Sequence, residues 1–300
     1  MRILVAGANG MVGNALIESL LQKGFDVATL TRNKYTRVGV ESFLWNPDRG
    51  ELDSKAFDGV DILINLAGEN VGAKRWTKKR KQQLRHSRIE SSGLLYREWE
   101  KTGKKLQAYI TASGVSYYGS VSRDKAFVEE DLPGSDFLAQ LSVDWEEAAD
   151  LFQTKAKRLI KMRMPMVLSN KGGAIVKLLG TMKFGPAVIM GNGAQYMPWI
   201  HIDDLVGAIL FFIDNEQSKG VYNISADTCP TNAEFMRSMG RIMNRPALKI
   251  PAFAMKWILG EMHIMLLEGS PVSNHKLKSD GFHFHFNEIE TALKHVLKSG

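Results

Sequence analysis

The sequence of 300 residues predicts an α/β protein in which helices cover both faces of a parallel sheet. The first observation is a set of short, mostly apolar runs typical of buried strands: RILVAG, DVATLTR, VDILINLAG, LQAYITASG, KRLIKMRMPMVLS and GVYNISA. The second is that helical segments separate these runs. In MVGNALIESLLQKG, for example, Val12, Leu16 and Leu20 lie on one helical face and Gly24 ends the helix.

The stretch GANGMVG joins the first strand to the first helix and carries three regularly spaced glycines. Gly7 permits a tight turn, Gly10 lets the backbone approach a pyrophosphate, and Gly13 lets the helix pack closely on the sheet. The N-terminus of that helix offers free N–H groups to phosphates. The sequence therefore predicts dinucleotide binding by Gly7, Asn9, Gly10, Met11, Val12 and Gly13.

The end of the second strand distinguishes NADP from NAD. NAD-binding proteins usually carry Asp or Glu there to bind the ribose hydroxyls, whereas this chain has Thr31 and Arg32. A carboxylate would repel the 2′-phosphate of NADP, but Arg32 can stack on adenine and pair with that phosphate. We therefore expect NADP rather than NAD. The alternative role of Arg32 is that of an exposed loop arginine.

The composition changes after Ser169, where a glycine-rich stretch begins. We expect a dinucleotide-binding domain of residues 1–165 plus about 196–226. A smaller C-terminal domain on the substrate side would comprise about 166–195 plus 227–300. The glycines of GGAIVKLLG and GPAVIMGNG predict a mobile loop in this smaller domain.

The overall composition predicts a protein of the cytoplasm. Cys229 is the only cysteine of the sequence, so no internal disulfide can form and a reducing compartment is expected. The N-terminus enters an apolar strand directly, which is unlike a secretory signal. The longest apolar run near the C-terminus, PAFAMKWILG, is too short to span a membrane, so no membrane partner is predicted.

The net charge of +7 comes largely from one run, AKRWTKKRKQQLRHSR. Such a run is usually one solvated face of a helix, and this is the favoured interpretation. Binding of an anionic small molecule is the alternative. Nucleic acid is not an expected partner, because no recognised binding motif accompanies the charge.

Four motifs together resemble the extended and atypical short-chain dehydrogenase/reductases: GANGMVG, NLAGE, SGVSYYG and WIHIDD. More narrowly, NLAGENVGAKRWT, SRIESSGLL and LLEG…GFHFHFNEIETAL are similar to an epimerase-family subgroup, often labelled nucleoside-diphosphate-sugar epimerases. The resemblance covers nearly the whole chain. It implies a Rossmann-type, doubly wound NADP-binding domain with a smaller C-terminal domain, and it allows a homodimer.

The resemblance also implies roles for residues at two strand ends. Thr31 and Arg32 would lie at the adenosine phosphate, while Leu66, Ala67 and Glu69 would line the cofactor. Glu69 could also act as an acid, or be an exposed loop carboxylate.

In the wider family a tyrosine exchanges a proton with the substrate, and a lysine four residues later lowers the pKa of its phenol. The corresponding segment here, SDFLAQLSVDWEEAAD, contains neither residue. Phe137 or Leu138 stands for the tyrosine, and Leu141 or Ser142 for the lysine. We expect this segment to remain a helix, with an apolar face toward the core made by Phe137, Leu141, Trp145 and Ala148.

Replacement proton donors are predicted in SGVSYYG. Ser113 follows the strand that carries the catalytic serine of the family, so Ser113 is the first candidate and Tyr117 the second. Since Tyr117 and Tyr118 are adjacent, one should point inward and the other elsewhere. Packing of both rings without a catalytic role is the alternative.

Other polar motifs receive structural interpretations. His201 and Asp203 of WIHIDDL are expected to cap a helix and to join the domains. His283 and His285 share one face of a possible strand but lack a third ligand, so no metal site is predicted. Arg75 beside Trp76 suits either a phosphate or a stacked ring, or a structural stack of the two side chains.

The sequence thus predicts an NADP(H)-binding oxidoreductase or epimerase for a small polar substrate, nucleotide-linked substrates included. A second hypothesis is an NADPH-binding protein without catalysis, which senses redox state or binds a partner. Nucleic-acid binding through the basic run is a distant third.

Overall fold

A computed structural model describes residues 1–33 and 36–298, and its central feature is an eight-stranded sheet. In chain order the strands are β1 (Arg2–Ala6), β2 (Asp26–Thr31), β3 (Val40–Asn46), β4 (Glu51–Leu52), β5 (Ile62–Asn65), β6 (Leu106–Gly114), β7 (Ala156–Met164) and β11 (Gly220–Asn223). Their spatial order is β11-β7-β6-β5-β1-β2-β3-β4. Neighbours are parallel, except that β4 runs antiparallel to β3.

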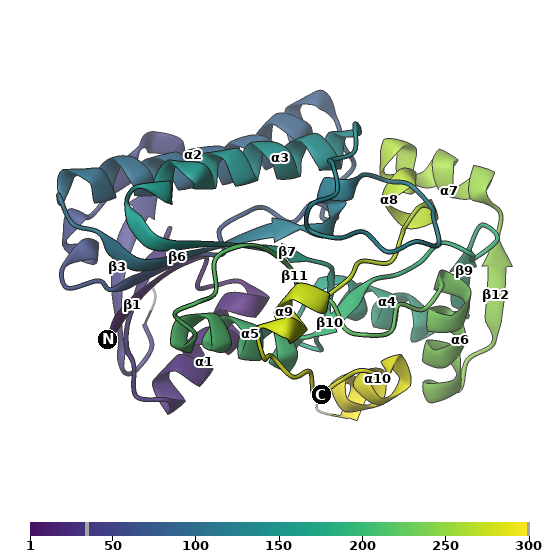
Figure 1. Ribbon diagram of the computed structural model, residues 1–300. Helices are drawn as coiled ribbons and strands as arrows, with labels where there is room; N and C mark the ends of the chain where they lie inside the picture. The colour runs from purple at the N-terminus through teal and green to yellow at the C-terminus, as the bar shows by residue number, and fades with distance from the viewer. Residues whose placement is uncertain (34–35, 299–300) are drawn as a thin grey trace.

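Helices cover both faces of this sheet (Figure 1). On one side lie α1 (Met11–Gln22) and α5 (Ile202–Asp214), and on the other lie α2 (Lys78–Lys101) and α3 (Phe137–Asp150). The strand β1 shows why both faces are apolar. Ile3 and Val5 belong to the hydrophobic cluster on the α1 and α5 side, whereas Leu4 and Ala6 belong to the opposite cluster. Successive side chains of a strand point to opposite faces, so β1 is buried on both.

The strand order reverses at β1. The next strands in sequence, β2 and β3, lie on one side of β1, and β5, β6 and β7 lie on the other. The chain therefore leaves β1 for the helix α1 on one face of the sheet and leaves β5 for α2 on the other face. Open α/β sheets bind ligands at the carboxyl edge where the strand order reverses in this way. The predicted doubly wound, Rossmann-type α/β fold is confirmed.

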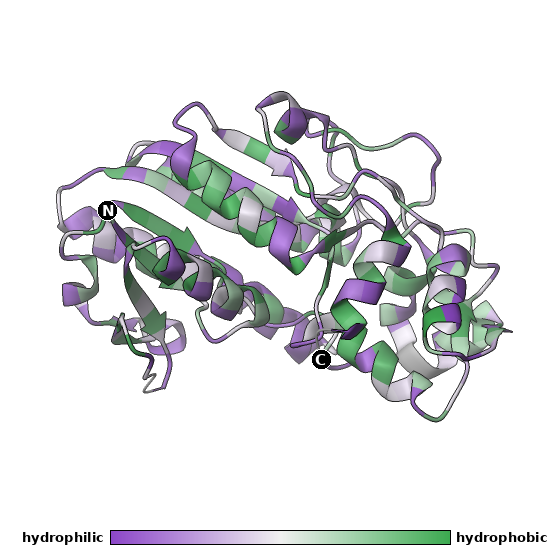
Figure 2. Cartoon of the chain, turned by 90° about the horizontal axis from the view of Figure 1, so that it is seen from below, coloured by the Kyte–Doolittle hydropathy of each residue, from purple (hydrophilic) through white to green (hydrophobic). Residues whose placement is uncertain are grey.

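The remaining elements form a smaller part beside the carboxyl edge (Figure 1). They are β8 (Met166–Leu168), α4 (Gly173–Met182), β9 (Ala187–Met190), β10 (Trp199–His201), α6 (Asn232–Ile242), β12 (Ala247–Ile250), α7 (Ala252–Leu259), α8 (Ile264–Leu267), α9 (His275–Ser279) and α10 (Ile289–Lys298). β8 pairs with β10, and β9 with β12. Figure 2 shows hydrophobic stretches on the inward faces of these helices and on the strands of the main sheet.

A third hydrophobic cluster holds together most of this smaller part, with Leu168, Ile175, Trp199, Phe235 and Leu293 among its buried members. Leu277 of α9 belongs instead to the cluster on the α1 and α5 side of the sheet. The predicted domain boundaries stay a prediction. Within the described ranges, every helix is too short or too polar to cross a bilayer.

The segment predicted to be a mobile loop contains regular structure, and its mobility stays a prediction. Gly172 and Gly173 have φ angles of 157° and 76°, and they lead directly into the helix α4. The second glycine-rich stretch contains the strand β9, which pairs with β12. Glycine content alone suggested flexibility, but the apolar residues between the glycines form regular structure.

Candidate cofactor and active site

The glycine loop after β1 brings the backbones of three segments into close contact. Gly7 has a φ of 85°, and a Cβ atom there would lie 2.6 Å from the carbonyl carbon of Leu66. A Cβ atom on Gly13 would lie 2.3 Å from the carbonyl oxygen of Gly7. Real Cβ atoms do not approach backbone this closely, so only glycine fits at both positions. The loop after β1 therefore lies directly against the loop after β5.

The loop delivers the N-terminus of α1 to the carboxyl edge. Gly10 is the N-cap of α1, and it provides no side-chain hydrogen bond to the first turn. The first N–H groups of such a helix have no partner within the helix, so they remain available to an anion. Asn9 and Gly10 are exposed, whereas Met11 and Val12 are half-buried. Met11 is the member of this loop that contacts the smaller part, since its sulfur lies beside Gly173.

The two residues predicted to lie at the adenosine phosphate, Thr31 and Arg32, have different surroundings at the end of β2. Thr31 is buried, and its hydroxyl donates to the carbonyl of Asn33 at 2.8 Å. Arg32 is exposed directly after it. Thr31 therefore shapes the turn, and Arg32 is the side chain that is free to meet a ligand.

Asn65 organises the loop after β5. Its amide donates to the Tyr109 hydroxyl at 3.1 Å and to Ser92 at 3.2 Å, and its carbonyl oxygen accepts from the Ala67 backbone at 3.1 Å. Leu66 continues the sheet by donating its N–H to the carbonyl of Ala6 at 2.9 Å. These bonds fix the backbone of residues 65–67 against the glycine loop.

Glu69 is held by α2. Its carboxylate pairs with Arg80, and its backbone carbonyl accepts from Arg88 at 3.0 Å. Neither role was predicted, because both arginines were assigned to a solvated helix face. That interpretation of the basic run is wrong for these two residues, which are each 7% exposed. Burial lowers the pKa of the Arg88 guanidinium to about 10, which leaves it charged at neutral pH.

The helix α3 forms where predicted, with Leu141, Trp145 and Ala148 buried as expected and Phe137 partly buried. Asp136 caps it by accepting from the backbone N–H groups of Leu138 and Ala139.

At the positions of the missing catalytic pair the helix presents Phe137 or Leu138 and Leu141 or Ser142, of which Phe137 is partly buried and the other three are buried. Leu138 packs in an apolar cluster with Leu84 and Leu141. The Ser142 hydroxyl lies 2.9 Å from that of Ser116, which follows β6. A hydroxyl pair therefore joins α3 to the loop after β6.

Ser113 lies at the end of β6 in a buried polar network. Its hydroxyl donates to the Glu146 carboxylate at 2.7 Å, and Ser113 is only 2% exposed. The same carboxylate accepts from Nε of Arg163 at 2.8 Å and from a terminal nitrogen of Arg163 at 2.9 Å. Burial alone would lower the pKa of the Arg163 guanidinium, but its hydrogen bonds and charge interaction with Glu146 raise the pKa above its ordinary value.

Glu146 and Arg163 were missed by the sequence reasoning. A signal existed in each case, because Glu146 lies on the buried face of α3 and Arg163 interrupts an apolar strand. A charge at such a position predicts a buried partner.

The two adjacent tyrosines separate as predicted, with Tyr118 buried and Tyr117 half-buried. The Tyr118 hydroxyl donates to Asn223 at 2.8 Å, and burial raises the pKa of Tyr118 to about 12. The ring of Tyr117 lies under the guanidinium of Arg163, 3.4 Å from its centre. In the described ranges, no side chain or backbone group hydrogen-bonds to the Tyr117 hydroxyl.

His201 caps α5 as predicted, since its Nδ1 accepts from the backbone N–H of Asp203 at 3.1 Å. Asp204 joins the segments by accepting from the N–H groups of His285 and Phe286. The stretch around His283 is not a strand, contrary to expectation.

His201, Asp203 and His295 do lie close enough together to be considered as metal ligands. However, Nδ1 of neutral His201 serves the cap, so Nε2 carries the proton and faces Nδ1 of His295 at 3.1 Å. Both nitrogens of His201 are thus occupied, which does not fit a metal ligand.

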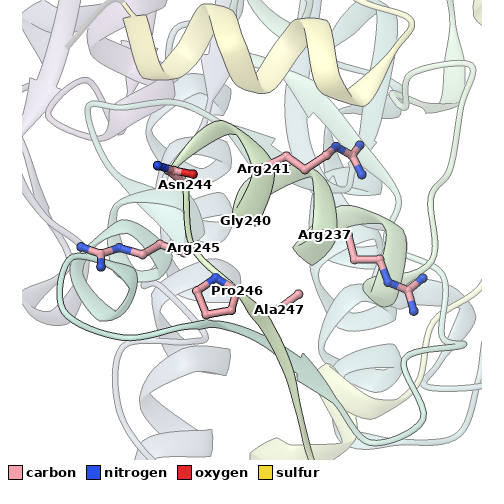
Figure 3. Close-up of a pocket in the computed structure, with 7 residues that line it drawn as sticks. All are labelled: Arg237, Gly240, Arg241, Asn244, Arg245, Pro246 and Ala247. Carbon is pink, nitrogen blue, oxygen red and sulfur yellow. The ribbon is translucent and has the colours of Figure 1, made fainter.

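A hollow of about 580 Å³ lies elsewhere, on α6 and the turn after it, and is lined by Arg237, Arg241 and Arg245 (Figure 3). The side chains of Arg237 and Arg245 extend to opposite sides, and Arg241 pairs with Glu290 at 2.8 Å. The three arginines do not converge on one point, so this hollow lacks the geometry of a phosphate site.

Comparisons with known proteins agree with this geometry. The model of the NAD dependent epimerase/dehydratase family matches residues 3–225, and a Domain of unknown function (DUF1731) matches residues 250–296. The Epimerase family protein ML0860 of Mycobacterium leprae is 38% identical over 98% of this chain and 95% of its own length.

Two solved structures extend the comparison. The human epimerase family protein SDR39U1, crystallised with NADPH, superposes with a TM-score of 0.87 at 30% identity, over 99% of both chains. The nucleoside-diphosphate sugar epimerase of Corynebacterium glutamicum gives a TM-score of 0.78 at 26% identity, over 99% of this chain and 58% of that chain. The chain belongs to the NAD dependent epimerase/dehydratase family.

Proposed function

We propose that the protein is an NADP(H)-dependent oxidoreductase or epimerase for a small polar substrate. The observation that carries the proposal is the glycine loop, where Gly7 and Gly13 leave no room for a side chain and place the open end of α1 at the carboxyl edge. The NADPH in the human relative supports the same cofactor here. When bound, this cofactor would supply or accept hydride.

The residues at the carboxyl edge fit such a cofactor. The N–H groups at the start of α1 would bind the pyrophosphate, and Asn9, Met11 and Val12 would line it. Arg32 would bind the 2′-phosphate, with Thr31 holding the turn. Leu66, Ala67 and the backbone at Glu69 would border the nicotinamide side, while the Glu69 carboxylate stays with Arg80.

For proton transfer we assign Tyr117 the leading role. Its hydroxyl has no hydrogen-bond partner in residues 1–33 and 36–298, and Arg163 holds its ring in place. Ser113 would act as a positioning residue, because its hydroxyl donates to Glu146 and thereby fixes Arg163. The Ser116 hydroxyl, half-exposed beside Ser142, is a second group that could contact the substrate.

The test is hydride transfer by the purified protein with NADPH, across carbonyl compounds and sugar nucleotides. The name of the Corynebacterium relative makes sugar nucleotides the first group to try. Tyr117→Phe should lower kcat by about 10²–10⁴-fold, the usual contribution of a general acid. Ser113→Ala should have a smaller effect.

The alternative is a protein that binds NADPH without catalysis, and the absence of tyrosine and lysine from α3 favours it. Tight NADPH binding with no turnover on any substrate would support this alternative. Turnover that Tyr117→Phe leaves unchanged would instead keep the enzyme and reject the assigned acid.

A further inference from the structure

The helix α7 exposes large apolar side chains that nothing in the described chain covers. Phe253 is 77% exposed and Trp257 is 90% exposed. They stand four residues apart in a helix, so they lie on the same face. Just before α7, Leu248 of β12 is 54% exposed. A helix with apolar side chains in water at this density indicates an interaction surface.

Exposed cations belong to α7 itself and to two segments next to it. A hollow of about 680 Å³ brings Arg75 together with Phe253, Lys256 and Trp257. Lys74 and Lys78 flank Arg75 in the chain, and Lys249 precedes α7. All of these cations are exposed, and in residues 1–33 and 36–298 none of their side chains forms an ion pair or hydrogen bond.

The one carboxylate in the hollow does not cancel this charge. Glu261 is paired with Lys81 of α2. The face therefore combines two exposed aromatic side chains with unpaired positive charge, and Figure 1 shows α7 at the periphery of the molecule beside α8.

We propose that α7 docks on an anionic bilayer surface, with Phe253 and Trp257 among the lipid headgroups and the surrounding cations near the lipid phosphates. Trp, Phe and Lys are the residues by which helices lie in a membrane interface. The run PAFAMKWILG is too short to span a membrane, but a helix that lies in the interface needs no such length.

The charge pattern argues against a second copy as the occupant. In a two-fold dimer the same patch meets itself, so the cations of one copy would face those of the other. An anionic lipid surface is complementary to the same cations. Two aromatic side chains alone bind a bilayer weakly, so the attraction between the cations and the anionic lipids must supply much of the affinity. Because salt screens this attraction, binding should depend strongly on salt concentration.

The test is co-sedimentation of the full chain with vesicles. One set contains phosphatidylcholine alone, and the other includes roughly 30% phosphatidylserine. We expect binding to the anionic vesicles only, with loss at about 1 M salt, where the Debye length is near 3 Å. Phe253→Ser with Trp257→Ser should abolish binding, and Lys249→Glu with Lys256→Glu should weaken it at least tenfold, since each lysine contributes about fivefold.

Matched variants control for general effects. Leu132→Ser with Phe184→Ser changes side chains that are 84% and 87% exposed elsewhere, and Lys104→Glu with Lys105→Glu reverses two exposed lysines beyond the other end of α2. Both should bind like the unaltered protein, and circular dichroism should show all variants folded.

Three results would overturn the proposal. The first is that the protein does not bind anionic vesicles, and the second is that the control variants lose as much vesicle binding as the α7 variants. The third is that the protein forms a concentration-dependent dimer without vesicles and that the α7 variants abolish this dimer. Equal binding to a single-stranded oligonucleotide through the same residues would assign the surface to nucleic acid instead.

Discussion

The glycine loop and the helix α3 serve the same edge of the sheet, but they contribute by different means. The loop contributes backbone, since Gly7 and Gly13 let the chain pass where a Cβ atom would collide. α3 would contribute side chains, but it contains neither the tyrosine nor the lysine that the wider family uses. A cofactor site built from backbone and a reaction site built from side chains can therefore change independently within one fold.

The strongest way to test the α3 side is to break its buried ion pair. Glu146→Ala would leave Arg163 charged and unpaired in a site where it is only 2% exposed. We expect the free energy of unfolding to fall by about 3–5 kcal/mol, measured by urea denaturation. Glu147→Ala, at the exposed neighbouring position, should change it by less than about 0.5 kcal/mol. Similar small losses in both variants would show that the pair does not hold this region.

His201, which lies outside both regions, should contribute to the pH dependence of stability between pH 4 and 7. Burial lowers the pKa of His201 to about 4, against 6.5 in an unfolded chain, while the charge of Asp203 raises it and that of His295 lowers it. Above pH 6.5 both states are neutral and stability is complete. As the pH falls from 6.5 to 4, His201 gains its proton mainly in the unfolded chain, so this side chain lowers the free energy of unfolding by up to about 3 kcal/mol.

His201→Asn keeps an acceptor for the Asp203 N–H but does not titrate. The free energy of unfolding, measured by urea denaturation at several pH values between 4 and 7, should therefore change less with pH in this variant than in the unaltered protein. An unchanged slope would place the titration on another group.

On the cofactor side, Gly13→Ala tests whether the backbone contact matters. The new methyl group would meet the Gly7 carbonyl oxygen at 2.3 Å, which forces α1 away from the loop. We expect a loss of about 1–3 kcal/mol in stability and at least about tenfold weaker NADPH binding in a fluorescence titration. Gly180→Ala is the control, because nothing lies within 4 Å of its Cβ position. Unaltered NADPH affinity in Gly13→Ala would remove the loop from the cofactor site.

The same contrast explains what could be predicted from the sequence. The parallel sheet and the glycine turn followed from local patterns, since apolar runs and glycine spacing are both short-range signals. The network of Ser113, Glu146 and Arg163 did not, because its members come from β6, α3 and β7 and only the fold brings them together.

The errors have a similar origin. The basic run was expected to be solvated, yet Arg80 and Arg88 turn inward toward Glu69, a partner that precedes the helix. Charge within one segment does not reveal a partner in another.

The central claim is that the cofactor edge is intact and selects NADP, although the usual acid and lysine are absent. Calorimetric titration of the protein with NADPH and NADH, repeated on Arg32→Ala, tests this most directly. The account predicts that NADPH binds more tightly than NADH. The affinity for NADPH should fall about tenfold or more in Arg32→Ala, and it should stay unchanged in Arg49→Ala, which alters an exposed arginine elsewhere. Equal or tighter binding of NADH, unaffected by Arg32→Ala, would contradict it.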